Sequence, residues 1–248
     1  MITNKDAKFI KSLQLKKYRV RENAFVVEGE KNIIELLKSN LQFHQLYLTE
    51  RFLAKNEEVL KSKATRFEYA TEKELIKVGS FQSNSGALAV VNIPYIPKIQ
   101  LKNNFYLAFE NIQDPGNLGT IIRIADWYGF TEVICSKDSV DAYNPKTVSA
   151  TMGSFTRIKV HYEDLSELID DSAISVYGAV LDGENIHQSK IGSKGLFLFG
   201  NESQGISKGL HNKITHKIKI PGYGQAESLN VAIATAVVCD NFRRIINF

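Results

Sequence analysis

The second half of this 248-residue chain alternates short apolar runs with helical patterns, and this alternation constrains the fold more than any other feature. Helical periodicity marks residues 120–129 and a C-terminal segment from about Ser228. Strand-like runs occur at 105–112, 132–136, 174–181, 195–201 and 216–221. Apolar strands that alternate with helices predict a mostly parallel sheet covered on both faces, which is an α/β fold.

The first half shows the same alternation on a smaller scale. Strand and helix patterns follow one another from residue 24 to residue 93, including a single helix predicted across 51–62. Thr71 and Glu74 have the spacing of a capping box at the start of a further helix. This part of the chain therefore predicts a small α/β domain of its own.

A boundary between the two halves is marked by proline. Pro94 and Pro97 bracket a stretch that fits neither the helical nor the strand period, which places a linker at about 95–103. The sequence thus predicts two domains, one over residues 1–97 and one over residues 104–248.

Composition excludes several classes of protein. With 44% apolar residues and five prolines, the chain can bury an ordinary core. It has no apolar run of about 18 residues and no basic start followed by an apolar segment, so we expect a cytoplasmic protein rather than a membrane or secreted one. Cys135 and Cys239 form no CxxC pair and are expected to be buried, and the five histidines show no ligand spacing, so no metal is predicted.

Positive charge is concentrated at the start of the chain. Only Asp6 and Glu22 oppose the basic residues of this stretch, which are Lys5, Lys8, Lys11, Lys16, Lys17, Arg19 and Arg21. Two interpretations remain open, a solvated helix face and a surface that contacts nucleic-acid phosphates.

Three polar, glycine-containing loops follow predicted strands: the first loop (111–119), the second loop (200–205) and the third loop (221–230). Parallel α/β sheets bind ligands beyond the carboxyl ends of their strands, so one site built from all three loops is expected. The chain contains neither GxGxxG after a strand nor GxxxxGK[ST], which argues against a dinucleotide enzyme and a P-loop NTPase.

The third loop runs directly into a helix that is apolar on nearly every side. Such a helix is expected to be buried, in the core or against a partner. The loop before it is then expected to lie near the interior, where its backbone groups need partners that a bound polar ligand could supply.

The segments NIQDPGNLGTIIRIADWYGF, LFLFGNESQGIS and IKIPGYGQAESLNVAIATA resemble the three ordered motifs of the SpoU-type (TrmH-like) RNA 2′-O-ribose methyltransferases, in the SPOUT superfamily. In the first half, AFVVEGEKNIIELL is similar to the RNA substrate-binding domain of many members. The resemblance implies a trefoil-knotted catalytic domain, S-adenosyl-L-methionine as cofactor, and a homodimer formed through the C-terminal helix. It implies methylation of a ribose 2′-hydroxyl, with rRNA favoured as substrate.

Two alternatives to this function stay open. One is a 2′-O-methyltransferase of the same fold that acts on tRNA. The other is an RNA-binding ribosome assembly factor that has lost catalysis. The separate first domain favours rRNA, and this preference rests on the resemblance alone.

The resemblance also assigns roles to residues. Arg123 is expected beside the reacting hydroxyl, where orientation and charge stabilisation suit arginine better than proton removal. Asn117 is expected to position Arg123 or the ribose, or else to cap the following helix. Glu202 is expected to hold RNA or to fix Asn117, or else to accept hydrogen bonds from donors of its own loop. Ser228 and Asn230 are expected to cap the last helix and to point into the site.

The expected cofactor contacts are mostly backbone groups of the second and third loops. They involve Gly200, Asn201, Ile220, Pro221, Gly222, Gly224, Ser228 and Leu229. Family members usually carry Met where this chain has Gly222, and this position is expected to contribute mainly its backbone. Trp127, on the helix after Arg123, is expected to be part of the core.

Overall fold

The computed structural model describes residues 1–62, 66–84, 86–172 and 174–246. The chain divides into two compact units. Unit 1 comprises Met1–Tyr95 and Asp141–Arg157, and unit 2 comprises Ile96–Val140 and Ile158–Phe248. The predicted division at residues 97 and 104 stays a prediction.

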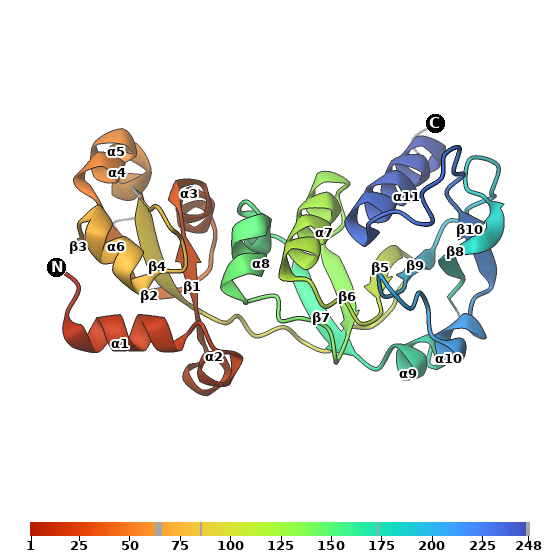
Figure 1. Cartoon of the computed structure of the whole chain (residues 1–248), viewed down its shortest axis with the longest axis horizontal. Helices are drawn as coiled ribbons and strands as arrows, with labels where there is room; N and C mark the ends of the chain where they lie inside the picture. The colour runs from red at the N-terminus through yellow and green to blue at the C-terminus, as the bar shows by residue number, and fades with distance from the viewer. Residues whose placement is uncertain (63–65, 85, 173, 247–248) are drawn as a thin grey trace. The chain divides into compact units, whose positions relative to one another are not determined.

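Unit 1 is a mixed sheet with helices on both faces (Figure 1). Its strands are ordered β1-β4-β2-β3, and among the described residues only the β2–β3 pair is parallel. Its elements are α1 (Asn4–Ser12), α2 (Lys16–Glu22), β1 (Ala24–Glu28), α3 (Glu30–Lys38), β2 (Phe43–Leu48), α4 (Glu50–Lys55), α5 (Glu57–Ser62), β3 (Glu68–Tyr69), α6 (Glu72–Val78), β4 (Ala87–Asn92), α8 (Pro145–Ala150) and the 3₁₀ helix η1 (Ser154–Thr156).

Local sequence explains where several of these elements begin and end. The predicted capping box is present, because Thr71 and Glu74 each accept a hydrogen bond from the other's backbone N–H at the start of α6. The single helix predicted across 51–62 is wrong, since α4 ends before Asn56 and α5 begins after it. The Asn56 side chain donates to the carbonyl of Phe52, a local bond that competes with helix continuation.

The segment 141–157 is part of the core of unit 1, although it lies far along the chain. Val148 of α8 belongs to the apolar cluster formed by β1, β2, β4 and α3. Tyr143 packs on Phe25 of β1 with ring centroids 4.6 Å apart. Arg19 of α2, which is 2% exposed, donates to Asp141 from Nε and Nη2 at 2.9 and 2.6 Å. Unit 1 is therefore completed by a segment from the second half of the chain.

Unit 2 contains a six-stranded sheet in which every recorded strand pair is parallel, in the order β10-β8-β9-β5-β6-β7. This confirms the predicted α/β class with a mostly parallel sheet. Its elements are β5 (Phe105–Phe109), α7 (Pro115–Trp127), β6 (Glu132–Ser136), β7 (Lys159–Glu163), α9 (Leu165–Asp170), β8 (Val176–Asn185), β9 (Gly195–Phe199), α10 (Lys208–His211), β10 (His216–Lys219) and α11 (Val231–Ile246).

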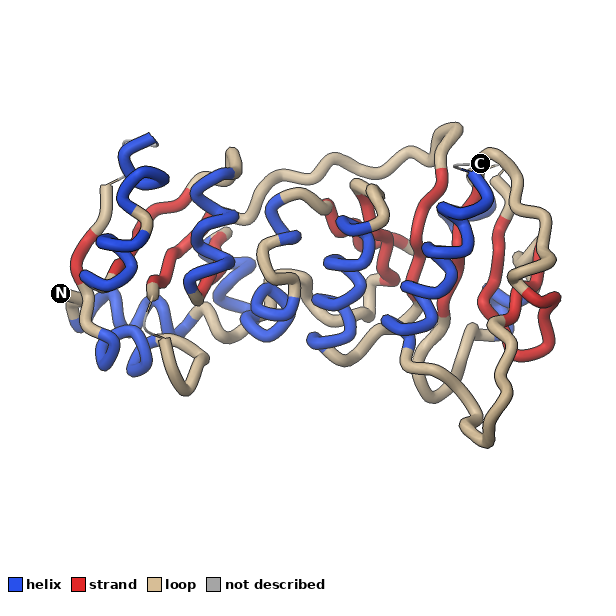
Figure 2. The backbone as a smooth tube through the Cα atoms, turned by 90° about the horizontal axis from the view of Figure 1, so that it is seen from above, coloured by secondary structure: helices blue, strands red, loops and turns tan. Residues whose placement is uncertain are grey.

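Helices cover both faces of this sheet, with α7 and α11 on one side and α9 and α10 on the other (Figures 1 and 2). Leu165 of α9 and Leu210 of α10 join the apolar cluster on their side. On the opposite side, Phe242 of α11 packs against Phe105 and Phe197, with ring centroids 4.3 and 5.4 Å apart. Aromatic packing of this kind fixes the position of α11 on the sheet.

The third loop and the helix after it differ from expectation. Helix α11 begins at Val231 and buries one face, which includes Val231, Val238 and Phe242, whereas Ile233 is 53% exposed. Residues 222–230 are exposed, so the expectation that this loop lies near the interior is wrong. The reason is that the buried stripe of α11 starts only at Val231, and the chain before it leaves the sheet surface.

Two further expectations concern the whole chain. Cys135 and Cys239 are buried free thiols, as predicted, and burial raises the pKa of each to about 12. Within the described residues, no helix is long and apolar enough to cross a membrane. Among the same residues, no group of three or more His, Cys, Asp or Glu side chains is arranged to hold a metal ion.

Candidate active site

A hydrogen-bonded chain of three side chains joins the three motif loops in unit 2. Asn117 Nδ2 donates to Glu202 Oε1 at 2.8 Å, and Asn230 Nδ2 donates to Asn117 Oδ1 at 3.0 Å. Each loop contributes one residue: Asn117 from the first, Glu202 from the second and Asn230 from the third. The amide of Asn117 thereby uses both its donor and its acceptor, so it fixes the positions of its two neighbours.

The hydrogen bonds that cap the starts of α7 and α11 determine which side-chain groups of Asn117 and Asn230 are free to bond to each other. Asp114, not Asn117, caps α7, since its Oδ1 accepts from the backbone N–H of Asn117 at 2.8 Å. The alternative role of Asn117 as a helix cap is therefore wrong. Asn230 does cap α11, because its Oδ1 accepts from Ala232 N at 2.9 Å while its Nδ2 reaches Asn117. The two roles expected of Asn230 coexist.

Arg123 and Ser228 lie outside this chain of contacts. Arg123 lies between one and two turns after Asn117 on α7, and its side chain is exposed. No ion pair or hydrogen bond of the Arg123 side chain is recorded within the described residues, so its guanidinium faces solvent as an available donor. Ser228 is also exposed, and its hydroxyl has no recorded partner in the same part of the structure.

The second loop is closed by its own backbone. Asn201 and Gly205 exchange two backbone hydrogen bonds, at 3.0 and 2.9 Å. A Cβ added to Gly200 would lie 2.1 Å from the carbonyl carbon of Gly205, so no larger residue fits there without a shift. Gly205 has φ +68°, which glycine adopts without strain. The loop therefore presents Glu202 from a fixed frame.

The Asn201 side chain is committed to structure. Its Oδ1 accepts from Ser203 N at 2.9 Å, and its Nδ2 donates to the carbonyl of Asn111 at 2.8 Å. Asn201 thus joins the second loop to the first. Its backbone N–H is also used, in the bond to Gly205, so the second lone pair of its carbonyl oxygen remains for the ligand contact expected from the sequence.

Sequence reasoning missed the residues that support the first loop from below. Ser136 Oγ accepts from Asn111 N at 2.7 Å, and Ser139 Oγ accepts from Ile112 N at 3.1 Å. Glu110, just before the first loop, accepts from the N–H of Ser207, just after the second loop, at 2.8 Å. The only signal in the sequence was their place in or close to the last residues of strand-like runs.

Trp127 is 83% exposed, so its expected place in the core is wrong. Helix α7 docks through Leu118, Ile121, Ile122 and Ala125, and Trp127 lies on the opposite side of the helix. It shares that side with Arg123, one turn earlier. The exposed face of α7 therefore carries a cation and a large aromatic ring next to each other.

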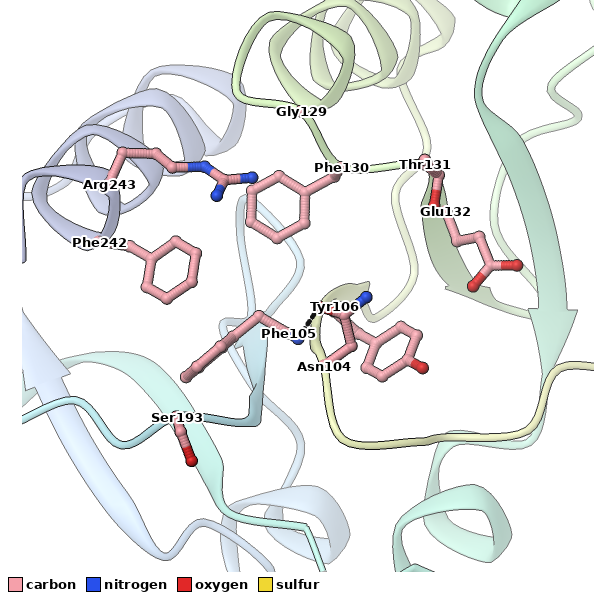
Figure 3. Close-up of a pocket in the computed structure, with 10 residues that line it drawn as sticks. All are labelled: Asn104, Phe105, Tyr106, Gly129, Phe130, Thr131, Glu132, Ser193, Phe242 and Arg243. Carbon is pink, nitrogen blue, oxygen red and sulfur yellow. Dashed lines mark hydrogen bonds between the residues drawn. The ribbon is translucent and has the colours of Figure 1, made fainter. Parts of the chain in front are cut away.

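A cavity of about 350 Å³ lies at the other end of the sheet (Figure 3). Its walls come from the first residues of β5 and β6 and from the last part of α11, and none of the predicted site residues lines it. Arg243 in its wall donates from Nε to the carbonyl of Tyr128 at 2.6 Å, and its guanidinium lies 5.4 Å from the Phe130 and Phe242 ring centroids. That arginine caps the carboxyl end of α7, so the cavity is a product of helix docking.

Residues 104–240 match the family model described as the SpoU rRNA methylase family, and residues 4–89 match an MRM3-like substrate-binding domain. The chain belongs to the SpoU rRNA methylase family. It is an RNA ribose 2′-O-methyltransferase that uses S-adenosylmethionine, as its motifs implied.

Some relatives of this SpoU methylase match it over nearly its whole length. It is 32% identical over 247 residues to the 23S rRNA (guanosine(2553)-2′-O)-methyltransferase RlmP of Bacillus subtilis, covering 97% of this chain and 96% of that one. A putative RNA methyltransferase of the TrmH family from Porphyromonas gingivalis has a TM-score of 0.86 at 31% identity, over 99% of each chain. An AdoMet-bound rRNA methyltransferase from Sinorhizobium meliloti has a TM-score of 0.86 at 27% identity, over 99% of this chain and 97% of that one.

The third loop of this SpoU methylase has the chemistry that an adenosine ligand requires. Within the described structure, the backbone groups of residues 221–229 make no recorded hydrogen bond to other backbone groups. No atom lies within 4 Å of where a Cβ of Gly222 or Gly224 would be, so a ligand could approach that backbone closely. Ile220 and Pro221 are half-buried, and Leu229 is 50% exposed, which supplies apolar surface beside free donors and acceptors. The residues of the third loop therefore fit S-adenosylmethionine as a ligand.

Proposed function

We propose that this enzyme methylates the ribose 2′-hydroxyl of one nucleotide in rRNA, most simply in the large-subunit RNA. The observation that carries this proposal is the pair of hydrogen bonds that joins the side chains of Glu202, Asn117 and Asn230, because it brings the three motif loops together. Similarity to RlmP over nearly the whole of both chains supports a large-subunit substrate.

Methyl transfer needs the hydroxyl oxygen in line with the methyl group, so positioning contributes much of the rate. Bound S-adenosylmethionine supplies an electrophilic methyl group on its sulfonium. Arg123, exposed and without a recorded protein partner, orients the ribose or an adjacent phosphate by charge-assisted hydrogen bonds. Arginine stays protonated where proteins fold, so the hydroxyl proton passes to another acceptor. Ser228 lies in the loop that holds the cofactor and contributes a hydroxyl near it.

We also propose a homodimer built on α7 and α11. Trp127 and Ile233 are 83% and 53% exposed, and these two helices contact each other within unit 2. Large exposed apolar side chains on two helices that pack together supply the kind of surface that a protein interface covers. Since Arg123 lies one turn from Trp127, such an interface borders the proposed site. The knotted backbone and a cytoplasmic location remain parts of this proposal that rest on the family resemblance and on composition.

The decisive experiment is a labelling assay with tritiated S-adenosylmethionine. The purified enzyme is incubated separately with undermethylated rRNA, ribosomal subunits and bulk tRNA, and labelled ribose is mapped. Label in rRNA or subunits that disappears with Arg123→Ala is the expected result. Label in tRNA alone would replace the substrate by tRNA. Cofactor binding without label in any pool would favour a silent assembly factor.

A further inference from the structure

Tyr223 is the most exposed aromatic side chain near the proposed site. It is 93% exposed, it makes no recorded ring contact or hydrogen bond within the described residues, and it lies between Gly222 and Gly224. Both glycines have open space where a Cβ would be. The ring is therefore held on a segment that can turn it without steric hindrance.

Tyr223 lies between Gly222 and Gly224, two of the expected cofactor contacts, but those contacts are expected from backbone groups, whereas the Tyr223 side chain is 93% exposed. Ile220 and Pro221 before it are half-buried. Asn230, at the end of the same loop, is hydrogen-bonded to Asn117. The Tyr223 ring, in contrast, leaves the loop on its solvent side. Both the cofactor and RNA reach this loop from solution, and an unstacked RNA base is the group that suits an exposed aromatic ring.

We infer that Tyr223 stacks on the base of the nucleotide that is methylated, or on its immediate neighbour, and so holds the ribose in place. This inference rests on the proposed function. Proteins that recognise RNA outside regular helices take unstacked bases onto aromatic side chains. Such stacking tolerates any base, because every base has a π face. Tyr223 therefore contributes to RNA binding and positioning and does not select the base.

Three variants at this position test the inference. Tyr223→Phe keeps the ring, Tyr223→Leu keeps apolar surface without the ring, and Tyr223→Ala removes both. A matched control is Tyr95→Ala, since Tyr95 is 90% exposed and lies outside the three loops. The assay measures KM and kcat for the RNA pool that the wild type labels, together with the Kd for S-adenosylmethionine by calorimetry.

Loss of a stacked base lowers kcat/KM by roughly 5- to 150-fold in Tyr223→Ala, mostly through KM. We expect Tyr223→Leu to fall nearly as far, and both Tyr223→Phe and Tyr95→Ala to stay within about twofold of wild type. The Kd for S-adenosylmethionine stays unchanged in all four.

Three results would overturn the inference. They are wild-type kinetics in Tyr223→Ala, an equal loss in Tyr95→Ala, and a weaker Kd for S-adenosylmethionine that accounts for the whole loss. The last result would place the ring on the cofactor. A wild-type enzyme that labels no RNA is a different outcome, because it contradicts the proposed function before any Tyr223 variant is compared.

Discussion

Asn230 donates a hydrogen bond at 3.0 Å to Asn117, which lies 113 positions earlier in the chain, and Asn117 in turn donates to Glu202. Asn230 also caps α11, so the start of that helix, the first turn of α7 and the second loop are fixed together. The consequence is a rigid frame made from side chains that are themselves at least partly exposed.

Replacement of Asn117 should therefore affect catalysis far more than stability. Asn117→Asp keeps an acceptor for Asn230 but places a carboxylate against Glu202, and Asn117→Ala removes both hydrogen bonds. Because these bonds are exposed, we expect the free energy of unfolding to change by less than about 1 kcal/mol. Misplacement of the site should lower kcat/KM by roughly 100-fold.

Urea unfolding and the tritium assay measure these two effects in the same preparations. Asn212→Ala, at an exposed asparagine of unit 2, serves as the control and should change neither. Equal losses of stability and activity in Asn117→Ala would show that the frame is structural only.

Prediction from sequence succeeded where the determinants are local or belong to a motif. The capping box at Thr71 and the parallel strands of unit 2 follow from spacing and periodicity. Trp127 and Arg19 were wrongly placed, because their environments depend on distant partners. The side of α7 that faces the sheet decides the exposure of Trp127, and Asp141, 122 positions away, decides the burial of Arg19.

Burial of Arg19 predicts a large loss of stability when its charge is removed. Arg19 is 2% exposed and donates to Asp141 and to the carbonyls of Leu13 and Gln14. Arg19→Ala would leave the Asp141 carboxylate and both carbonyls without this donor. We expect the free energy of unfolding to fall by about 3–5 kcal/mol.

The matched control is Arg21→Ala, since Arg21 forms an exposed pair with its neighbour Glu22. Exposed pairs contribute about 0–1 kcal/mol, so this variant should unfold almost as the wild type does. Equal midpoints for the two variants in urea unfolding would contradict the structural role assigned to Arg19.

The basic patch at the start of the chain is accordingly smaller than its sequence suggested. Lys16, Lys17 and Arg21 are exposed and remain available to phosphates, whereas Arg19 is not. Replacing these three by Gln should weaken RNA binding and reduce its dependence on salt. The slope of log K against log salt concentration should become shallower by roughly 0.7–0.9 for each phosphate that is no longer neutralised. Filter binding over a salt series measures the slope, and an unchanged slope would identify the patch as a solvated face. Cofactor affinity should not change.

A homodimer built on α7 and α11 should dissociate when a charged side chain is introduced into its interface. Trp127→Glu and Ile233→Glu each replace an exposed apolar side chain of these helices by a carboxylate, which is costly to bury in an interface. We expect both variants to be monomers in sedimentation velocity when the wild type is a dimer. Leu181→Glu, at a 70% exposed leucine of β8, is the control and should leave the assembly state unchanged. A wild-type monomer at all concentrations would refute the dimer.

His161 should make unit 2 less stable as the pH falls below neutrality. Its side chain is buried on β7, with Nε2 at 3.6 Å from Glu132 Oε1. Burial lowers the pKa of His161 from its ordinary 6.5, with Lys159 acting in the same direction and Glu132 and Glu163 opposing it. The unfolded chain therefore binds a proton on His161 more readily than the folded chain does. The free energy of unfolding is not reduced by this residue above pH 6.5, and it decreases as the pH falls below that value.

The loss should reach at most about 1.4 kcal/mol for each pH unit below 6.5. Asp6 and Glu74, whose pKa values are lowered from 3.8 and 4.5, do not titrate in this window. Urea unfolding at intervals from pH 8 to pH 5.5 measures the effect, which His161→Gln should flatten. His44→Gln, at an exposed histidine, should leave the profile as it is. A profile that is flat in the wild type would mean that the Glu132 and Glu163 carboxylates offset the cost of burying the imidazole.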